Sequence, residues 1–292
     1  MRIVVAFFIG AFVSMSCAFL LAEEVPVEAI EGWKWLEQDL STVNGTTSRD
    51  VANRKETIRF AFQGKLGKAD GVQQSSQNES QNVTLFNESH SFQLAKNKDD
   101  KFILGSVADR NNDRRVRDVS SYIKVSVAIG SILLRDAINS KDFVFSDWKI
   151  NEFGNCTCIV KCVSADPDRP FDTLFAEFDP KNHFRVTKSI ATLSLPVPMT
   201  IERTPVYSDS SLPNKVTTKV QVGDRPPSTE ETIYSDVSKS PLPKSEFTLS
   251  HYGLPEYAAP TEPWSLKFKI LLFTAIFALS GLGIWFFKRN KP

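Results

Sequence analysis

Two uncharged apolar runs, one near each end, constrain this chain more than any other feature. The first extends from Ile3 to Ala22 behind Arg2, and the second extends from Ile270 to Phe287 between basic residues. Each is close to the roughly 20 residues that a helix needs to cross the hydrocarbon core of a bilayer. The segment between them is polar enough to be soluble, so we expect one folded region with membrane-directed sequences on both sides.

The N-terminal run has the order of a signal peptide: a basic start, an apolar stretch, and Ala22 before Glu23. We expect residues 1–22 to be removed after export. Two alternatives stay open, a lipoprotein cut before Cys17 and an uncut helix that spans the membrane.

The C-terminal run is the expected anchor, and residues 267–292 are predicted to form a transmembrane helix with a short basic tail. Trp264 and Trp285 lie near its ends, where interfacial aromatic residues are common. Basic residues follow the run, and with the signal peptide they favour a cytoplasmic tail. The sequence therefore predicts a single-pass protein of the cell membrane whose ectodomain is extracytoplasmic.

Composition excludes one class of partner. The chain has 35 basic and 34 acidic residues and a net charge of +1, so no global attraction to nucleic acid is expected. It has 22 Phe against 5 Tyr, which favours apolar burial over a polar binding surface. Residues 23–222 are enough for one sizeable core.

Hydrophobic spacing predicts an α+β domain over residues 23–222, built on an antiparallel sheet. Apolar residues at three- and four-residue steps predict helices over 26–42 and 118–139. Alternating apolar residues predict strands, and a polar stretch over 70–82 predicts a loop. The expected strands lie at 57–64, 83–85, 92–94, 102–107, at several places within 143–193, and at 215–222.

Scattered prolines among Ser, Thr, Lys and Glu predict a linker or stalk over residues 223–266. The patch Phe247–Glu256 interrupts it. We favour a short strand plus turn that docks on the domain, with a peptide-like recognition patch as the alternative.

The cysteines that remain after signal removal fall in one strand-like segment. Cys156, Cys158 and Cys162 share one face of that strand because side chains alternate. A zinc site needs a second pair of ligands, which the spacing does not offer. We expect buried apolar cysteines, an interpretation that leaves room for one strained disulfide, with a redox or metal role as the alternative.

No known catalytic signature occurs in the sequence. We found no nucleophile elbow, phosphate-binding loop, zinc-protease helix or calcium loop. His90, His183 and His251 are the only histidines, and none lies beside a nucleophile pattern. We therefore assign no catalytic, metal or cofactor-binding residues and expect no cofactor.

The order of elements resembles the periplasmic lipoprotein-carrier (LolA-like) superfamily. The resemblance covers about residues 26–222 and rests on the strand Thr57–Gly64 and the hairpin Asp172–Ser189, which turns at Asp179 and Pro180. It implies a curved sheet, a half-barrel, that wraps one or two helices and an apolar cavity. Separately, Phe247–Glu256 followed by a membrane helix looks like the ending of secreted, membrane-anchored planctomycete proteins, a family with no activity to transfer.

Two functions compete at this stage. The first is a non-enzymatic binding or sensing module for a lipid or a peptide, and the alternative is an envelope hydrolase with a dispersed site. A filled core would explain the abundant phenylalanines, whereas a curved sheet would let some of them line a cavity. The candidate lining residues for an apolar ligand are Phe60, Phe62, Phe143, Phe145, Phe175 and Phe178.

Overall fold

The computed structural model describes residues 24–258, apart from positions 52–53, 75–78, 112–115, 117–118, 121–122, 131, 165–168 and 195. Its residues up to Leu254 belong to one compact unit. The predicted signal peptide and anchor lie outside the described residues. Among those that are described, no helix has the length and apolar character to cross a bilayer.

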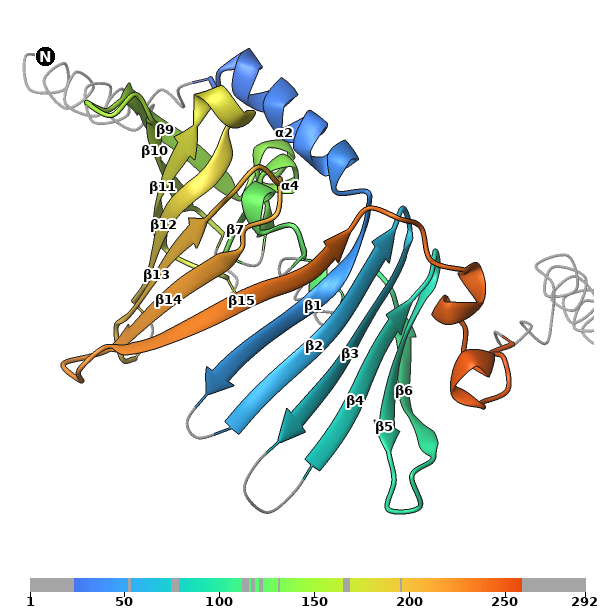
Figure 1. Cartoon of the computed structure of the whole chain (residues 1–292). Coiled ribbons are helices and arrows are strands. Elements are labelled where there is room, and N and C mark those ends of the chain that lie inside the picture. The colour runs from blue at the N-terminus through green and yellow to red at the C-terminus, as the bar shows by residue number, and fades with distance from the viewer. Residues whose placement is uncertain are drawn as a thin grey trace, which may run out of the picture. The chain divides into compact units, whose positions relative to one another are not determined.

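The main element of the described residues is one antiparallel sheet of 13 strands (Figure 1). Its first half contains β1 (Thr42–Val51), β2 (Arg54–Gln63), β3 (Leu66–Gln74), β4 (Glu79–Phe86), β5 (His90–Lys96) and β6 (Phe102–Asp109). Its second half contains β9 (Phe143–Ile150), β10 (Cys156–Cys162), β11 (Thr173–Asp179), β12 (Arg185–Leu193), β13 (Met199–Val206), β14 (Lys215–Val222) and β15 (Ser228–Ser238).

The order of strands in the sheet differs from their order in the sequence, because the first strand and the last strand lie side by side in the middle. The chain proceeds from β1 to the edge strand β6, crosses to the other edge at β9, and returns until β15 pairs with β1. Thr47 then stands opposite Tyr234, far away in the sequence. The crossing segment, residues 110–142, contains η1 (Val125–Val127), β7 (Ala128–Ile129), β8 (Ile132–Leu133) and α4 (Leu134–Asn139).

The sheet curves around helix α2 (Val27–Asp39) and the crossing segment (Figure 1). We call this side the inner face and the opposite side the outer face. Irregularities in strand register accompany the curvature, for example between Asn44 and Thr46 and between Gln93 and Leu94. Such bulges bend and twist a sheet locally. The main core joins residues of α2, the crossing segment and both halves of the inner face.

Helix α2 is fixed to the hairpin between β11 and β12. The indole nitrogen of Trp33 donates a hydrogen bond of 2.9 Å to the carbonyl of Phe184, and the ring of Trp35 stacks on His183 at 3.8 Å. Gly32 allows this approach, because a Cβ there would lie 2.6 Å from the carbonyl oxygen of His183. The helix predicted at 26–42 is confirmed.

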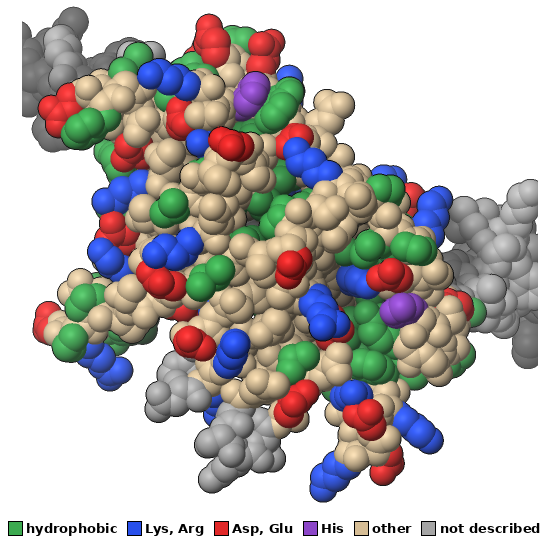
Figure 2. Space-filling model, viewed as in Figure 1, with side chains coloured by type: hydrophobic (Ala, Val, Ile, Leu, Met, Phe, Trp, Pro, Cys, Tyr) green, Lys and Arg blue, Asp and Glu red, His purple; other side chains and the backbone are tan. Residues whose placement is uncertain are grey.

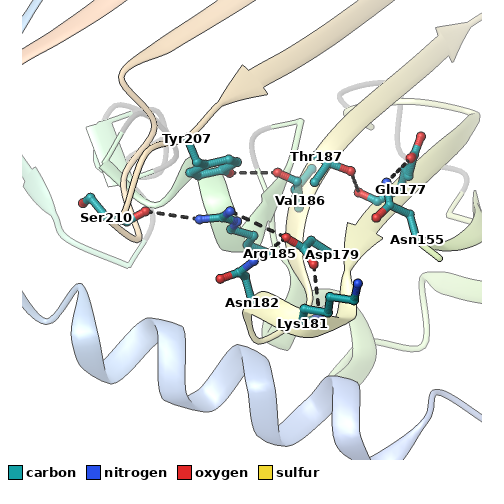
Figure 3. A network of polar contacts seen from close by, with 10 residues as sticks. All are labelled: Asn155, Glu177, Asp179, Lys181, Asn182, Arg185, Val186, Thr187, Tyr207 and Ser210. Atoms are coloured by element: carbon teal, nitrogen blue, oxygen red, sulfur yellow. Dashed lines mark hydrogen bonds and ion pairs between the residues drawn. The ribbon is translucent and has the colours of Figure 1, made fainter. Parts of the chain in front are cut away.

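A network of polar contacts holds the hairpin that receives α2 (Figure 3). The Asp179 carboxylate accepts hydrogen bonds from the Lys181 amide and the Asn182 side chain, at 3.0 and 2.6 Å. Arg185 lies 3.6 Å from Asp179 and stacks over the Tyr207 ring. This confirms the predicted turn, in which Asp binds the local backbone and Pro presets φ.

Residues 239–254, which we call the C-terminal cover, pack on the outer face of the first half-sheet. Phe247 and Leu249 are buried, and Glu246 forms an ion pair with Lys68 of β3. The ring of Tyr252 contacts Phe102 of β6, with centres 5.0 Å apart. The predicted docking is confirmed, but the predicted short strand is wrong, because the patch forms the short 3-10 helices η3 (Lys244–Phe247) and η4 (Ser250–Tyr252) instead.

Two sequence-based predictions were wrong, and a third was wrong in part. The predicted loop at 70–82 is largely β3 and β4, and the linker predicted from 223 contains β15. In both places backbone hydrogen bonds make the ladder, so polar side chains do not prevent strand formation. The helix predicted at 118–139 is wrong in part: Val119, Ser120 and Ile123 are helical, whereas the chain from Val125 on forms η1, β7, β8 and the short α4. Gly130, whose φ is 62°, lies outside the right-handed helical region and interrupts the predicted helix.

We predict that Gly32→Val lowers the free energy of unfolding by about 1–3 kcal/mol or more, because its side chain must displace backbone atoms of the hairpin. Denaturant unfolding followed by circular dichroism measures this. Glu31→Ala changes an exposed residue of the same helix and should leave stability within about 0.5 kcal/mol. Equal stability of Gly32→Val and wild type would contradict the close approach.

Candidate functional site

The inner face of the first half-sheet contains an apolar hollow of about 250 Å³, which we call the inner hollow. Residues Val119 and Ile123 of the crossing segment line it from above the sheet. The strands β1 to β5 supply the rest of the lining: Thr47, Ile58, Phe60, Ala69, Gly71, Asn82, Thr84 and Gln93. The volume lies just below the roughly 300–1,000 Å³ of typical small-molecule sites, which suits one narrow apolar chain.

Strand register explains why these residues meet. Ile58, Gly71 and Asn82 stand opposite one another in β2, β3 and β4. Phe60, Ala69 and Thr84 form the next row on the same face. Residues opposite each other in a ladder point to one side of the sheet, so two rows of alternating positions create the surface.

Small residues in β3 make the hollow. A Cβ at Gly71 would meet nothing closer than Asn82 O at 3.7 Å and Ile58 Cγ1 at 3.8 Å. At the start of β3, the ring of Phe86 fills the space above Gly67. A Cβ at Gly67 would lie 2.0 Å from that ring. The row that contains Gly67 is therefore filled by an aromatic ring and belongs to the core. The rows that contain Ala69 and Gly71 are left open and line the inner hollow.

The polar groups in the lining do not make the hollow a reaction site. Gln93 donates a hydrogen bond of 2.5 Å to the Thr84 hydroxyl, and Thr47 and Asn82 are the other polar side chains among the described lining residues. None of the ten lining residues is ionisable. The described lining residues thus offer apolar contact and a few neutral polar groups, and none of them is a general acid or base.

The six candidate phenylalanines do not lie in one site, and of the six only Phe60 is among the described lining residues of the inner hollow. Phe60 lines the inner hollow, while Phe62 packs on Phe86 with ring centres 6.2 Å apart. In the second half-sheet, Phe145 and Phe178 belong to the core around Trp148, and Phe143 packs on Phe171. Phe175 lies on the outer face, because the buried inner residues of β11 are Leu174, Ala176 and Phe178.

Sequence reasoning missed most of the lining. Gly67, Ala69 and Gly71 alternate along β3, and this row of small residues on one face was the available signal. This row of small residues was not recognised because residues 70–82 were predicted to form a loop.

The cysteines line one face of β10, as predicted. Cys156 and Cys158 are buried, Cys162 is half-buried, and all three are free thiols. Burial raises the pKa of the Cys156 thiol, and burial with Cys156 as neighbour raises that of Cys158. Within the described ranges, no group of three His, Cys, Asp or Glu residues is arranged to hold a metal ion.

We predict that an alkylating reagent at about pH 8 modifies Cys162 first and spares Cys156 and Cys158 until the protein unfolds. Only the thiolate reacts, and a raised pKa keeps buried thiols protonated. Mass spectrometry of tryptic peptides over time gives the order. Modification of Cys158 at the rate of Cys162 would show that the inner face of β10 is open to solvent.

Charge does not define a second site on the surface in view. Acidic and basic side chains are interspersed over the face shown in Figure 2. This mixture agrees with the balanced composition and gives no large field of one sign for a charged polymer.

Comparison with known proteins gives only distant structural likeness. No protein-family profile and no curated protein matches the chain. A LolA-superfamily protein from Nitrosomonas europaea is 11% identical, with a TM-score of 0.46 over 77% of this chain and 100% of its own. A domain described as an outer membrane lipoprotein-sorting protein, from Vibrio parahaemolyticus, is 12% identical, with a TM-score of 0.48 over 78% of this chain and 97% of its own. At such scores the likeness carries no functional assignment.

Proposed function

We propose that this protein is a membrane-anchored, extracytoplasmic module that binds an apolar chain, such as the acyl chain of a lipid, in the inner hollow. The observation that supports this is a largely apolar cavity on a curved sheet, roofed by Val119 and Ile123, whose described lining residues carry no ionisable group. A non-enzymatic role follows from that chemistry, and the carrier-type half-barrel is the architecture that we propose for it.

The energetics favour an apolar ligand over water. Burying apolar surface is worth about 25 cal/mol per Å², before the cost of association. Ile58, Phe60 and Ile123 would contact the ligand.

Export and anchoring complete the proposal. The two terminal apolar runs support a signal peptide at residues 1–22 and a membrane helix within 267–292. The C-terminal cover would then connect the sheet that holds the ligand to the segment that leads to the membrane.

Gly71→Leu tests the binding site. In bacterial cells fed a photoreactive fatty acid, the wild-type chain should cross-link at peptides that contain Ile58, Phe60 or Ile123. A leucine at position 71 fills the hollow and removes about 1.5–3 kcal/mol of ligand burial, so the yield should fall about tenfold or more. Peptide mass spectrometry locates and quantifies the cross-links.

Gly105→Leu is the matched control, since Gly105 lies exposed on the edge strand β6. It should leave the yield unchanged, and both variants should unfold at denaturant concentrations no lower than wild type. Cross-links distributed without preference for the inner hollow, or a Gly71→Leu yield equal to wild type, would refute apolar binding at this site.

Reporter fusions test the topology. An enzyme that is active only outside the cytoplasm should be active when fused after Pro263, and one active only inside should be active when fused after Pro292. The basic residues behind the second apolar run are the physical reason. If both fusions report the cytoplasm, export is wrong.

A further inference from the structure

Two half-buried cations lie over a pair of aromatic rings on the inner face. The Nζ atom of Lys124 is 4.7 Å from the centre of the Phe62 ring, and the guanidinium carbon of Arg110 is 5.6 Å from that of Phe86. The two rings are themselves 6.2 Å apart. Both cations therefore stand over one aromatic floor, at distances typical of cation–π contacts.

This floor adjoins the inner hollow. Phe62 and Phe86 follow the lining residues Phe60 and Thr84 by two positions, about 7 Å along a strand, and so point to the same face. On the opposite wall, Lys124 directly follows Ile123, another lining residue. The cations thus mark one end of the apolar site.

Carboxylates act electrostatically on both cations, Glu37 on Lys124 and Glu88 on Arg110. Oε2 of Glu37 also contacts Arg135 at 3.4 Å, while its Oε1 is buried and accepts no hydrogen bond from the described residues; Glu88 also contacts Lys65 at 3.7 Å. Asp136 also acts on Lys124 but is exposed to solvent. Burial lowers the pKa of Lys124 and of Arg110, although Glu37 and Glu88 respectively oppose this. A bound anion would favour the charged form of both.

We propose that Lys124 and Arg110 bind the anionic headgroup, a carboxylate or a phosphate, of an amphiphile whose chain occupies the inner hollow. This rests on the apolar site proposed above and adds the chemical class of its ligand. The two cations come from different parts of the chain, one after β6 and one before η1. A headgroup between them joins the edge of the sheet to the crossing segment through charge-assisted hydrogen bonds.

The test compares headgroups on the full-length chain in nanodiscs of zwitterionic phosphatidylcholine. Three photoreactive probes of equal chain length are used: a fatty acid, an alkyl phosphate and a fatty alcohol. For wild type, we expect the cross-link yield in the inner hollow to be about tenfold or more higher for an anionic probe than for the alcohol. The preferred anion, carboxylate or phosphate, shows whether a free fatty acid or a phospholipid-type headgroup is bound.

Lys124→Met keeps an apolar stem of similar length and removes the charge. It should lower the yield of the anionic probe about tenfold and leave the alcohol unchanged, whereas Lys124→Arg should retain the preference. Lys149→Met, at an exposed lysine of β9, is the matched control and should change nothing.

Two results would overturn the headgroup site alone: equal yields for the acid, the phosphate and the alcohol in wild type, or equal loss of all three in Lys124→Met. The second result would indicate a structural role for Lys124. If no probe, including the alcohol, reaches the inner hollow, the proposed apolar site fails and the headgroup site fails with it.

Discussion

The pairing of β1 with β15 holds the structure together, because it joins two half-sheets that the chain builds separately. Without this ladder, β1–β6 and β9–β15 would each be a meander with an open edge at the centre. The pairing also sets where the crossing segment must go, since the chain has to travel from one outer edge to the other over the inner face. Val119 and Ile123 reach the hollow by this route. The ladder is also long-range in sequence, which makes its formation slow relative to local hairpins.

Because side chains alternate along a strand, the first half-sheet makes different contacts on its inner and outer faces. In β3, Ala69 and Gly71 face the inner hollow, while Lys68 faces outwards and pairs with Glu246 of the C-terminal cover. In β4, Thr84 faces inwards and Leu85 is buried on the outer face. The same strands therefore contact the proposed ligand on one side and the segment that continues towards the C-terminal apolar run on the other.

Local patterns predicted the local elements. Helix α2 was foreseeable because Trp33, Leu36 and Leu40 share one stripe, and the β11–β12 turn because Asp179 and Pro180 restrict the backbone. Strand β15 could not be predicted in this way, because only Thr232 and Tyr234 among its residues are buried and its ladder is made by the backbone. Its position beside β1 depends on contacts far away in the sequence, which periodicity does not contain.

The candidate site was harder to predict than the fold. The abundance of phenylalanine suggested that these rings line a cavity, but most of the six candidates pack against other core residues. Phe178 lies against Trp33, with ring centres 5.4 Å apart, and Phe62 lies against Phe86. What defines the hollow is the lack of side-chain volume at Ala69 and Gly71. A cavity is set by which small residues of different strands become neighbours, and that is known only once register is known.

The account depends on an apolar chain lying in the inner hollow, and crystals of the protein grown with a brominated fatty acid would locate it directly. Bromine scatters anomalously, so its position can be found independently of weak density for a flexible chain. We expect an anomalous peak among Ile58, Phe60 and Ile123, with the carboxylate end towards Lys124 and Arg110. Ordered water in the hollow, with bromine absent there or found only on the protein surface, would contradict the account.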